Sequence, residues 1–500
     1  MIHVFLRFVK PRGGTEHMME VFNVGSILVL FYYVFSLALI VQIILDNKPP
    51  EVAVGWILAI FFLPYAGAVI YLLGGINWKK RKIMKQLPER TFKTYLGPIL
   101  DRQKHFLQET AGTFDNDVVK TISLALQSGN SILTLNNSAR FYFEGAGFFD
   151  DLVRDLEEAR DTIHLEFFIY RSDELGRRLY SILKRKSDEG VKVRALFDGV
   201  GCFNKMSWKF KRELKQSNIE ARYFLDPMNV LSGRLLNYCN HRKIVVIDGK
   251  VAYTGGMNVG NEYITGGPHF HRWRDTQVRL SGESVQLLQG VFLSDWYNSG
   301  GDAILDARFF PLPDTTHFSS PMQIVVSGPD SDWNSLKMIF LHLISNANKK
   351  VYIQSPYFIP DQALTNVLES AALSGVEINL MMTGVPDKRI PFWVAYTYFE
   401  NLLDAGVRIY QYTAGFLHAK VMIVDDSLAT VGSCNMDIRS FNLDYEVNAF
   451  FYNPEIAQEL IAQFYNDIAE CREISYKDVH ELQLWKRFRN SIFRMIAPVL

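Results

Sequence analysis

Two long apolar runs mark the start of the chain, at about 24–45 and 52–73, with the polar stretch 46–51 between them. Each run approaches the ~20 residues that a helix needs to cross a bilayer. The pattern predicts a transmembrane helical hairpin within residues 1–78. A cleaved signal sequence would have a shorter apolar core. A buried core hairpin, or a re-entrant hairpin in which Pro64 and Gly67 bend the second run, would produce a similar pattern.

Basic side chains flank both runs. Arg7, Lys10 and Arg12 precede the first run, and Lys79, Lys80, Arg81, Lys82 and Lys85 follow the second. Because cytoplasmic flanks of membrane segments are enriched in Lys and Arg, both flanks are expected on the cytoplasmic side. We therefore predict a multi-pass protein of the cell membrane whose main body faces the cytoplasm.

Beyond a basic, partly helical connector at 79–132, the apolar pattern alternates between helix and strand, and it does so twice. The first half, 133–310, predicts a helix at 148–160, a strand at 162–170, a helix at 175–187 and a strand at 190–198. The second half, 311–480, repeats this order at 335–347, 350–355, 361–373 and 375–382. This alternation predicts an α/β fold of two pseudo-twofold-related halves, each a mixed sheet flanked by helices.

A polar motif recurs in the two halves. His241, Lys243 and Asp248 are matched by His418, Lys420 and Asp425, and a small-residue turn with an Asn follows each copy, at 255–258 and 432–435. In a strand, residues two apart share a face, so His and Lys of each copy are expected to point at one site. A single copy would more often be a solvated strand edge. Recurrence in the same order and spacing favours a catalytic role.

These residue types fit transfer of a phosphodiester group. One imidazole attacks phosphorus and forms a phosphohistidine, while the other protonates the leaving alkoxide and later deprotonates the incoming alcohol. Lys243, Lys420, Asn258 and Asn435 supply positive charge and hydrogen-bond donors for the developing negative charge. Gly256 and Ser433 belong to turns whose backbone can approach a substrate closely. This scheme needs no metal ion or other cofactor.

The amino-acid composition argues against several classes of function and site. The 500 residues include 53 basic and 53 acidic side chains, and 48% of the chain is hydrophobic. A neutral balance argues against a dedicated nucleic-acid binder, which needs a positive surface. The four cysteines are widely separated and predict reduced thiols, because a disulfide framework or zinc site would show paired spacing.

The paired motifs resemble those of the phospholipase D superfamily, and the stretches 163–166, 273–276, 355–361 and 415–420 resemble bacterial cardiolipin synthases. The resemblance extends over most of the chain and implies two phospholipase D-like halves sharing one active site. It also implies His241 as the nucleophile and an acid that orients each imidazole, Asp275 for His241 and Glu446 for His418. One departure is Asp444, which stands where the family usually has Asn.

The activity implied by this resemblance is phosphatidyl transfer between two phosphatidylglycerol molecules, giving cardiolipin and glycerol. No nucleotide is required, and the sequence has no Gly-x4-Gly-Lys-Ser/Thr phosphate-binding loop. Hydrolysis of phospholipid to phosphatidic acid and a non-catalytic membrane scaffold are competing functions; a nuclease is disfavoured by the apolar runs and neutral charge. The expected partners are phosphatidylglycerol, cardiolipin and the membrane, and no nucleic acid is expected. The sequence leaves open whether the protein forms a homo-oligomer.

Four further segments have two interpretations each. Glu166, matched by Gln354, is either a satisfied polar residue at a strand end or a headgroup contact at the mouth of the site. The basic and aromatic segment 204–216 is a solvated helix face or a membrane-surface element. The aromatic segment 390–399 favours a core helix over a lipid-facing lip. The amphipathic segment 481–500 is an interfacial helix or one docked on the protein body.

Overall fold

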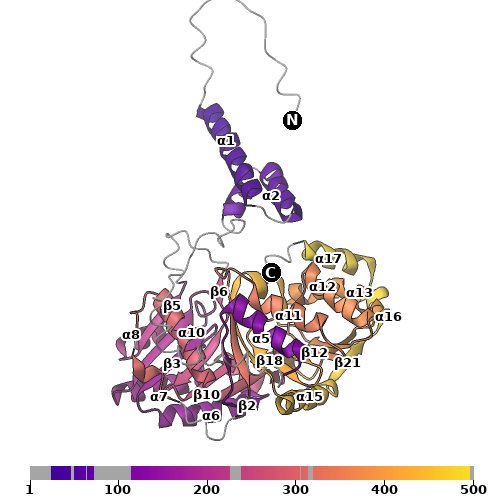
Figure 1. Ribbon diagram of the computed structural model, residues 1–500. Coiled ribbons are helices and arrows are strands. Elements are labelled where there is room, and N and C mark those ends of the chain that lie inside the picture. The colour runs from indigo at the N-terminus through magenta and orange to yellow at the C-terminus, as the bar shows by residue number, and fades with distance from the viewer. Residues whose placement is uncertain are drawn as a thin grey trace, which may run out of the picture. The chain divides into compact units, whose positions relative to one another are not determined.

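The computed structural model describes residues 24–46, 50–63, 65–72, 114–225, 238–304, 306–312 and 319–495 (Figure 1). The chain divides into two compact units, Met1–Asn77 and Trp78–Leu500. The cations that flank the two apolar runs, on which the predicted membrane orientation depends, lie outside the described residues.

The first unit contains α1 (Val24–Leu45), α2 (Pro50–Phe62) and α3 (Ala66–Ile70). In the described part of the chain, only the stretch Ile27–Leu45 of α1 is long and apolar enough to cross a membrane. Within the second apolar run, α2 ends at Phe62 and α3 packs against it, so the run contains a bend in the region of Pro64 and Gly67 where the sequence allowed one. A Cβ on Gly67 would lie 2.2 Å from the carbonyl oxygen of Ala59, so this contact requires glycine.

The second unit holds two sheets with the same strand order, which confirms the predicted repeat. The first sheet runs β2 (Asn137–Tyr142), β10 (Gln277–Gly282), β8 (Val251–Gly255), β7 (Lys243–Ile247), β3 (Thr162–Phe167), β4 (Lys192–Asp198) and β5 (Glu220–Phe224). The second runs β11 (Met322–Ser327), β20 (Asp444–Phe451), β18 (Leu428–Gly432), β17 (Val421–Val424), β12 (Lys350–Gln354), β14 (Glu377–Thr383) and β15 (Arg408–Tyr412).

Short strands extend the second sheet at both edges. At one edge β21 (Cys471–Ile474) pairs with β15, and at the other β1 (Leu133–Thr134) pairs with β11. Residues 133–134, expected to open the first half, therefore belong to the sheet of the second half. The preceding helix α5 (Asn116–Gly129) also packs on the second half, against α11 and β11.

Helices cover the sheets at matching places in the two halves. In chain order they are α6 (Gly145–Glu158), α7 (Glu174–Asp188), α8 (Trp208–Gln216) and α10 (Ser284–Asn298), then α11 (Ser335–Ser345), α12 (Gln362–Leu373), α13 (Arg389–Asp404) and α15 (Pro454–Ile468). Equivalent helices begin in the same way: Asp173 caps α7 by accepting from Gly176 N, and Asp361 caps α12 by accepting from Leu364 N. Further helices are α9 (Glu262–Thr265), α14 (Ile438–Asn442), α16 (Tyr476–His480) and α17 (Leu484–Arg494).

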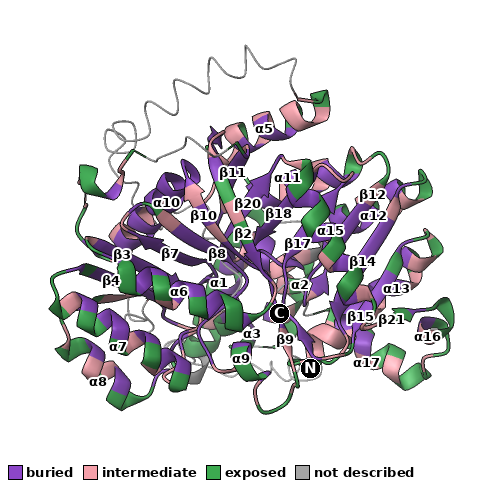
Figure 2. Cartoon of the chain, turned by 90° about the horizontal axis from the view of Figure 1, so that it is seen from below, coloured by how far each residue is buried: buried purple, intermediate pink, exposed green. Residues whose placement is uncertain are grey.

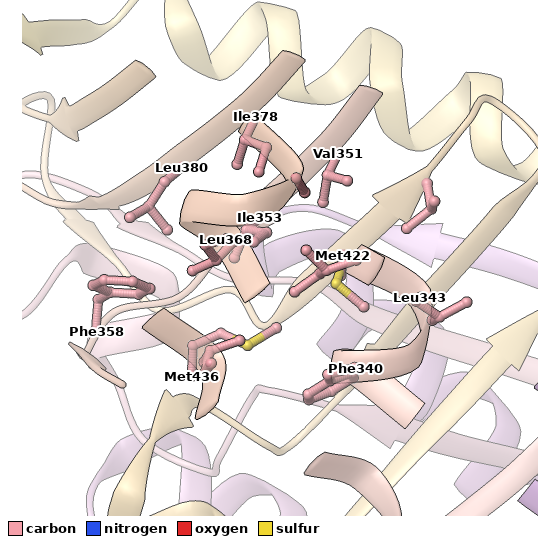
Figure 3. Packing of buried hydrophobic residues seen from close by; sticks show 14 of the residues in the cluster. Phe340, Leu343, Val351, Ile353, Phe358, Leu368, Ile378, Leu380, Met422 and Met436 are labelled. Atoms are coloured by element: carbon pink, nitrogen blue, oxygen red, sulfur yellow. The ribbon is translucent and has the colours of Figure 1, made fainter. Parts of the chain in front are cut away.

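Apolar packing joins helices to sheets and one half to the other. In the second half, Val351, Ile353, Ile378 and Leu380 of the sheet lie against helix residues such as Leu368 (Figure 3). Another cluster contains residues of both halves, and the rings of Phe141 and Phe451 are 5.3 Å apart within it. The central strands are almost entirely buried, whereas exposed residues follow the outer faces of the helices (Figure 2). The two halves therefore share one packed core.

Candidate active site

The two halves exchange short parallel strands next to the motif histidines. β6 (Cys239–Asn240) pairs with the start of β20, and β16 (Phe416–Leu417) pairs with β9 (Trp273–Arg274). His241 N donates to Tyr445 O at 2.9 Å, and His418 N donates to Arg274 O at 2.7 Å. Each histidine backbone is therefore held by a strand of the opposite half.

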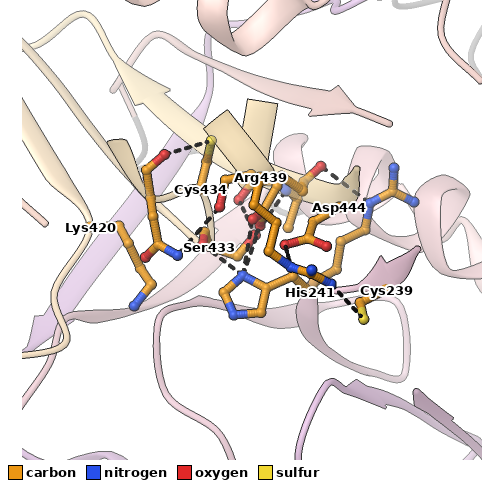
Figure 4. A network of polar contacts seen from close by, with 12 residues as sticks. Cys239, His241, Lys420, Ser433, Cys434, Arg439 and Asp444 are labelled. Atoms are coloured by element: carbon orange, nitrogen blue, oxygen red, sulfur yellow. Dashed lines mark hydrogen bonds and ion pairs between the residues drawn. The ribbon is translucent and has the colours of Figure 1, made fainter. Parts of the chain in front are cut away.

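The same exchange decides which acid contacts which imidazole. His241 Nδ1 lies 3.0 Å from Ser433 O (Figure 4) and 3.0 Å from Glu446 Oε1. His418 Nδ1 lies 2.6 Å from Asp275 Oδ2. The expected pairing of Asp275 with His241 and of Glu446 with His418 is wrong. The strands β6 and β16 carry each histidine to the acid-bearing strand of the other half. Because Nδ1 faces the carboxylate, Nε2 is the ring nitrogen left for a substrate.

Both motif lysines are buried beside the histidines, as the strand periodicity predicts. Lys243 Nζ donates to the carbonyl oxygen of His241, and Lys420 Nζ donates to that of His418. Lys420 of the second half lies beside His241 of the first (Figure 4). Burial lowers the pKa of Lys243 to about 7 and that of Lys420 to about 8, although the nearby Glu446 and Asp275 partly oppose this.

The imidazoles are neutral in this environment. Burial, followed by the charges of Lys243 and Lys420, lowers the pKa of His241 well below its usual value. Burial and Lys420 lower the pKa of His418 to about 4. An unprotonated ring nitrogen is available for attack at neutral pH. An anionic phosphodiester placed between the lysines would raise the pKa of both rings and allow one of them to hold a proton.

Ser433 and Gly256 lie behind the imidazoles, in equivalent turns. The Ser433 hydroxyl donates to the Glu446 carboxylate and accepts from Val447 N at 3.0 Å, while burial raises the pKa of Glu446 to about 7. A Cβ on Gly256 would lie 2.0 Å from Asp275 Oδ1, so the carboxylate occupies the space that a side chain would need. Both residues support the acids, which differs from the direct substrate contact expected from sequence.

The two motif asparagines have different surroundings. Asn258 is fully engaged: its Oδ1 accepts from Ile169 N at 3.0 Å and its Nδ2 donates to Tyr263 Oη at 3.2 Å. The ring of Tyr263 in turn lies 6.4 Å from that of His418. Asn435 Nδ2 donates to Ser440 Oγ at 3.3 Å, and its buried Oδ1 has no hydrogen-bond partner among the described residues.

Asp248 and Asp425 do not belong to the catalytic cluster, contrary to expectation. Each follows a central strand, β7 or β17, at the end away from the motif histidine. Asp248 accepts three backbone N–H groups at the start of β3, at 2.8–2.9 Å. Asp425 accepts three at the start of β12, at 2.6–3.0 Å. Both have positive φ, 53° and 51°, in the tight turns that follow β7 and β17. Their carboxylates therefore join neighbouring strands.

Glu166 is a buried strand residue. It accepts from Asn240 Nδ2, the residue before His241. Burial and the neighbouring Asp295 raise its pKa well above the usual value, although Arg242 opposes this. Glu166 is therefore an internal polar residue whose Oε2 has no hydrogen-bond partner among the described residues, and its contact with a headgroup stays a prediction.

Two buried ion pairs near the site were not predicted. Arg242 pairs with Asp295 of its own half, whereas Arg274 reaches across and binds Asp467 of the second half at 3.0 and 2.8 Å. Between His and Lys the first motif has Arg242 and the second has Ala419, and the buried acid of the second half, Asp467, is paired by Arg274 of the first half. Arg274 also donates to Asp275 O at 2.7 Å, so the pair holds the acid that contacts His418. The sequence signal that could have indicated these ion pairs is an acid within a long helix of each half, Asp295 in α10 and Asp467 in α15.

Comparisons with known proteins agree with this geometry. The family model described as "Cardiolipin synthase, PLD-like domain" matches residues 152–296 and 340–468, and "Phospholipase_D-nuclease N-terminal" matches 34–75. The chain is 37% identical to the major cardiolipin synthase ClsA of Bacillus subtilis (strain 168), covering 96% of this chain and 100% of that protein. It is 36% identical to a cardiolipin synthase of Staphylococcus aureus (strain Mu50), covering 95% and 96%.

A phosphatidylserine synthase of Haemophilus influenzae has the same fold, with a TM-score of 0.56 and 15% identity over 76% of this chain and all of that chain. Both phospholipase D-like halves are matched by the family model, and the relatives are similar along nearly the whole length. The chain belongs to the cardiolipin synthase family of the phospholipase D superfamily.

Proposed function

We propose that this protein is a phosphatidyltransferase that joins two phosphatidylglycerol molecules into cardiolipin and releases glycerol. One observation carries the proposal: two imidazoles, each held by a carboxylate of the opposite half, lie among two buried lysines. That arrangement offers a nucleophile, a proton carrier and positive charge at a single phosphorus atom. The similarity to proteins named cardiolipin synthase selects the lipid substrate.

The reaction proceeds by two displacements at phosphorus. In the first, His241 Nε2 attacks the phosphodiester, the bond from phosphorus to the headgroup glycerol oxygen breaks, and His418 gives that oxygen its proton. In the second, His418 takes the proton of a glycerol hydroxyl on another phosphatidylglycerol, whose oxygen attacks phosphorus and breaks the bond to His241. Lys243 and Lys420 offset the negative charge at both transition states. One phosphodiester replaces another, so no nucleotide is consumed.

Product analysis and intact mass test this assignment. Purified enzyme given phosphatidylglycerol with a labelled headgroup should release labelled glycerol and form cardiolipin. His241→Ala and His418→Ala should each lose nearly all turnover, and only His418→Ala should retain a phosphatidyl adduct. An adduct on His241→Ala alone would reverse the two roles. Phosphatidic acid as the main product would replace transfer by hydrolysis, and substantial turnover in either variant would refute the mechanism.

The proposal places the catalytic unit, residues 78–500, on the cytoplasmic side of the membrane. α1 supplies one apolar helix of sufficient length, and the cations flanking the apolar runs favour the cytoplasm. A cysteine introduced at Asn47 should react with an impermeant reagent added outside intact cells, whereas one at Lys85 should not. The opposite labelling pattern would place the catalytic unit outside.

A further inference from the structure

The helices α8 and α13 occupy equivalent places in the two halves. α8 follows β4 and precedes β5, just as α13 follows β14 and precedes β15. The pseudo-twofold relation that exchanges the two motif histidines therefore also exchanges these helices. A feature that both helices share lies symmetrically about the active site.

Both helices begin close to the catalytic residues. Before α13, Asp387 accepts from Tyr357 Oη at 2.7 Å, and its charge acts on Lys420. Before α8, Cys202 Sγ donates to Phe168 O at 3.3 Å, and the ring of Phe168 lies 4.8 Å from that of His241. The loops that lead into both helices therefore reach the active site.

In the second half, α17 covers α13 and turns its apolar side outward. Its inner side contacts α13, with the Arg489 guanidinium 3.9 Å from the centre of the Trp393 ring and the Phe493 ring 5.5 Å from it. The polar Asn490 is buried, whereas Phe488 is 69% exposed. The other exposed apolar residues of this side are Leu484, Trp485, Ile492 and Met495. The prediction that segment 481–500 forms a helix docked on the protein body is therefore confirmed. In this position the helix keeps a stripe of apolar side chains facing outward.

α17 also carries positive charge, part of which faces α13: Arg489 and Arg494 lie over the Trp393 and Tyr398 rings, and Arg487 pairs with Glu400. α17 contains four cations, Lys486, Arg487, Arg489 and Arg494, and no acid. In a soluble helix the apolar side would be expected against the body. The observed combination of exposed aromatic residues with basic side chains is typical of helices that lie at the surface of anionic bilayers.

The first half presents the same combination at the equivalent place. Trp208 at the start of α8 is 83% exposed, and Phe203 just before the helix is also exposed. Lys211 Nζ lies 5.4 Å from the Trp208 ring centre and 5.2 Å from that of Phe203. α8 carries four cations, Lys209, Lys211, Arg212 and Lys215, against the single acid Glu213.

We propose that the outer side of α17 and the Phe203–Trp208 region of α8 together form a docking surface for an anionic lipid bilayer around the active site. A twofold axis perpendicular to a plane brings the equivalent helices α8 and α13 to the same height above that plane, and α17 lies on α13, so both regions can meet one flat bilayer. The whole chain is electrically neutral, whereas these two helices are strongly basic, which favours anionic lipid over a second copy as the occupant. The inference rests on the proposed function and extends it by stating how the site meets its lipid.

Site-directed fluorescence on the full-length protein tests this surface. In a Cys471→Ser background, the variants Phe488→Cys and Trp208→Cys would each carry an environment-sensitive dye. The matched control is Leu373→Cys. Leu373 is 73% exposed and is the last residue of α12. It precedes the amino end of β14, which lies at the sheet edge away from the active site. The protein is reconstituted into vesicles of phosphatidylglycerol and phosphatidylcholine, with or without lipids carrying a nitroxide quencher on the acyl chain.

We expect a blue-shifted emission and quenching by the nitroxide lipid at positions 488 and 208, and neither effect at 373. Both effects should weaken in vesicles of phosphatidylcholine alone and persist in His418→Ala, so the result is independent of turnover. A water-like signal at either test position would overturn the two-sided surface. A blue shift without quenching by lipid would assign the surface to another protein copy, and an equal signal without phosphatidylglycerol would refute the anionic preference.

Discussion

His241 Nδ1 lies 3.0 Å from Glu446 Oε1, although the two residues belong to opposite halves of the catalytic unit. His418 and Asp275 form the reciprocal contact at 2.6 Å. Neither half contains both a catalytic histidine and the acid that orients it. The active site therefore exists only when the halves are packed together.

Substitution of the two acids tests this exchange. Glu446→Gln should resemble His241→Ala, and Asp275→Asn should resemble His418→Ala, with each acid variant losing ~10²–10⁴-fold in turnover, because a misoriented imidazole cannot act efficiently. Accumulation of the phosphatidyl adduct, measured by intact mass, provides the comparison. If Glu446→Gln instead accumulated adduct like His418→Ala, each acid would serve the histidine of its own half. Unchanged melting temperatures would show that the variants remain folded.

The motif aspartates should affect stability more than catalysis. Asp248→Ala and Asp425→Ala remove acceptors from three backbone N–H groups each and should lower the free energy of unfolding by about 1–3 kcal/mol. Turnover per folded molecule should change less than about threefold, because the carboxylates lie at strand ends away from the imidazoles. Asp248→Asn tolerates the left-handed backbone and keeps one acceptor, so it should lose less stability. A hundredfold loss of turnover at wild-type stability would restore a catalytic role.

The buried lysines predict the alkaline pH dependence. Burial lowers the pKa of Lys243 to about 7 and that of Lys420 to about 8, so both lose positive charge as pH rises through this range in the free enzyme. Attraction for the anionic phosphodiester then weakens, and kcat/KM should fall above about pH 7–8. Lysines of ordinary pKa would keep kcat/KM level until about pH 10.

The lowered pKa values of Lys243 and Lys420 also make the stability of the protein depend on pH. Because the folded-state pKa of each lysine lies below its unfolded value, the unfolded chain binds more protons between about pH 7 and 10. The contribution of these groups to the free energy of unfolding should therefore increase with pH over that window. At pH 7, Lys243→Met should raise this free energy by about 1–2 kcal/mol while abolishing turnover. A lower melting temperature for this variant would contradict the cost assigned to burying the lysine.

The pair formed by Arg274 and Asp467 should be critical for stability. Arg274→Leu leaves Asp467 buried without its cation and should cost about 3–5 kcal/mol, measured by denaturation in detergent. The double variant Arg274→Leu with Asp467→Leu removes both charges and should recover much of this loss. If the double variant were less stable than Arg274→Leu alone, the ion pair would not be the source of the effect.

Reaction direction should respond to glycerol, because one covalent intermediate can be resolved by either of two alcohols. Molar glycerol should suppress net cardiolipin formation and, from pure cardiolipin, should yield phosphatidylglycerol. Thin-layer chromatography of radiolabelled lipid measures both directions. Formation of mainly phosphatidic acid, in a ratio that glycerol does not change, would identify water as the natural acceptor.

Sequence alone determined the repeated features that depend on local periodicity and turn chemistry. The helices and strands predicted in the two halves are all present in the predicted order, from α6 to β4 and from α11 to β14, because apolar spacing along a segment reports which face is buried. The duplication of His241 and Lys243 as His418 and Lys420 likewise identified the chemical groups.

Only the tertiary structure decided how these groups are combined. The exchange of β6 and β16 between the halves assigns Glu446 to His241 and Asp275 to His418, and Arg274 of the first half pairs with Asp467 of the second. Likewise, the contact of Gly67 with α2 interrupts the second apolar run, and α17 turns its apolar side away from α13. Pairings between segments far apart in the chain depend on packing and strand exchange, so they cannot be predicted from local sequence patterns.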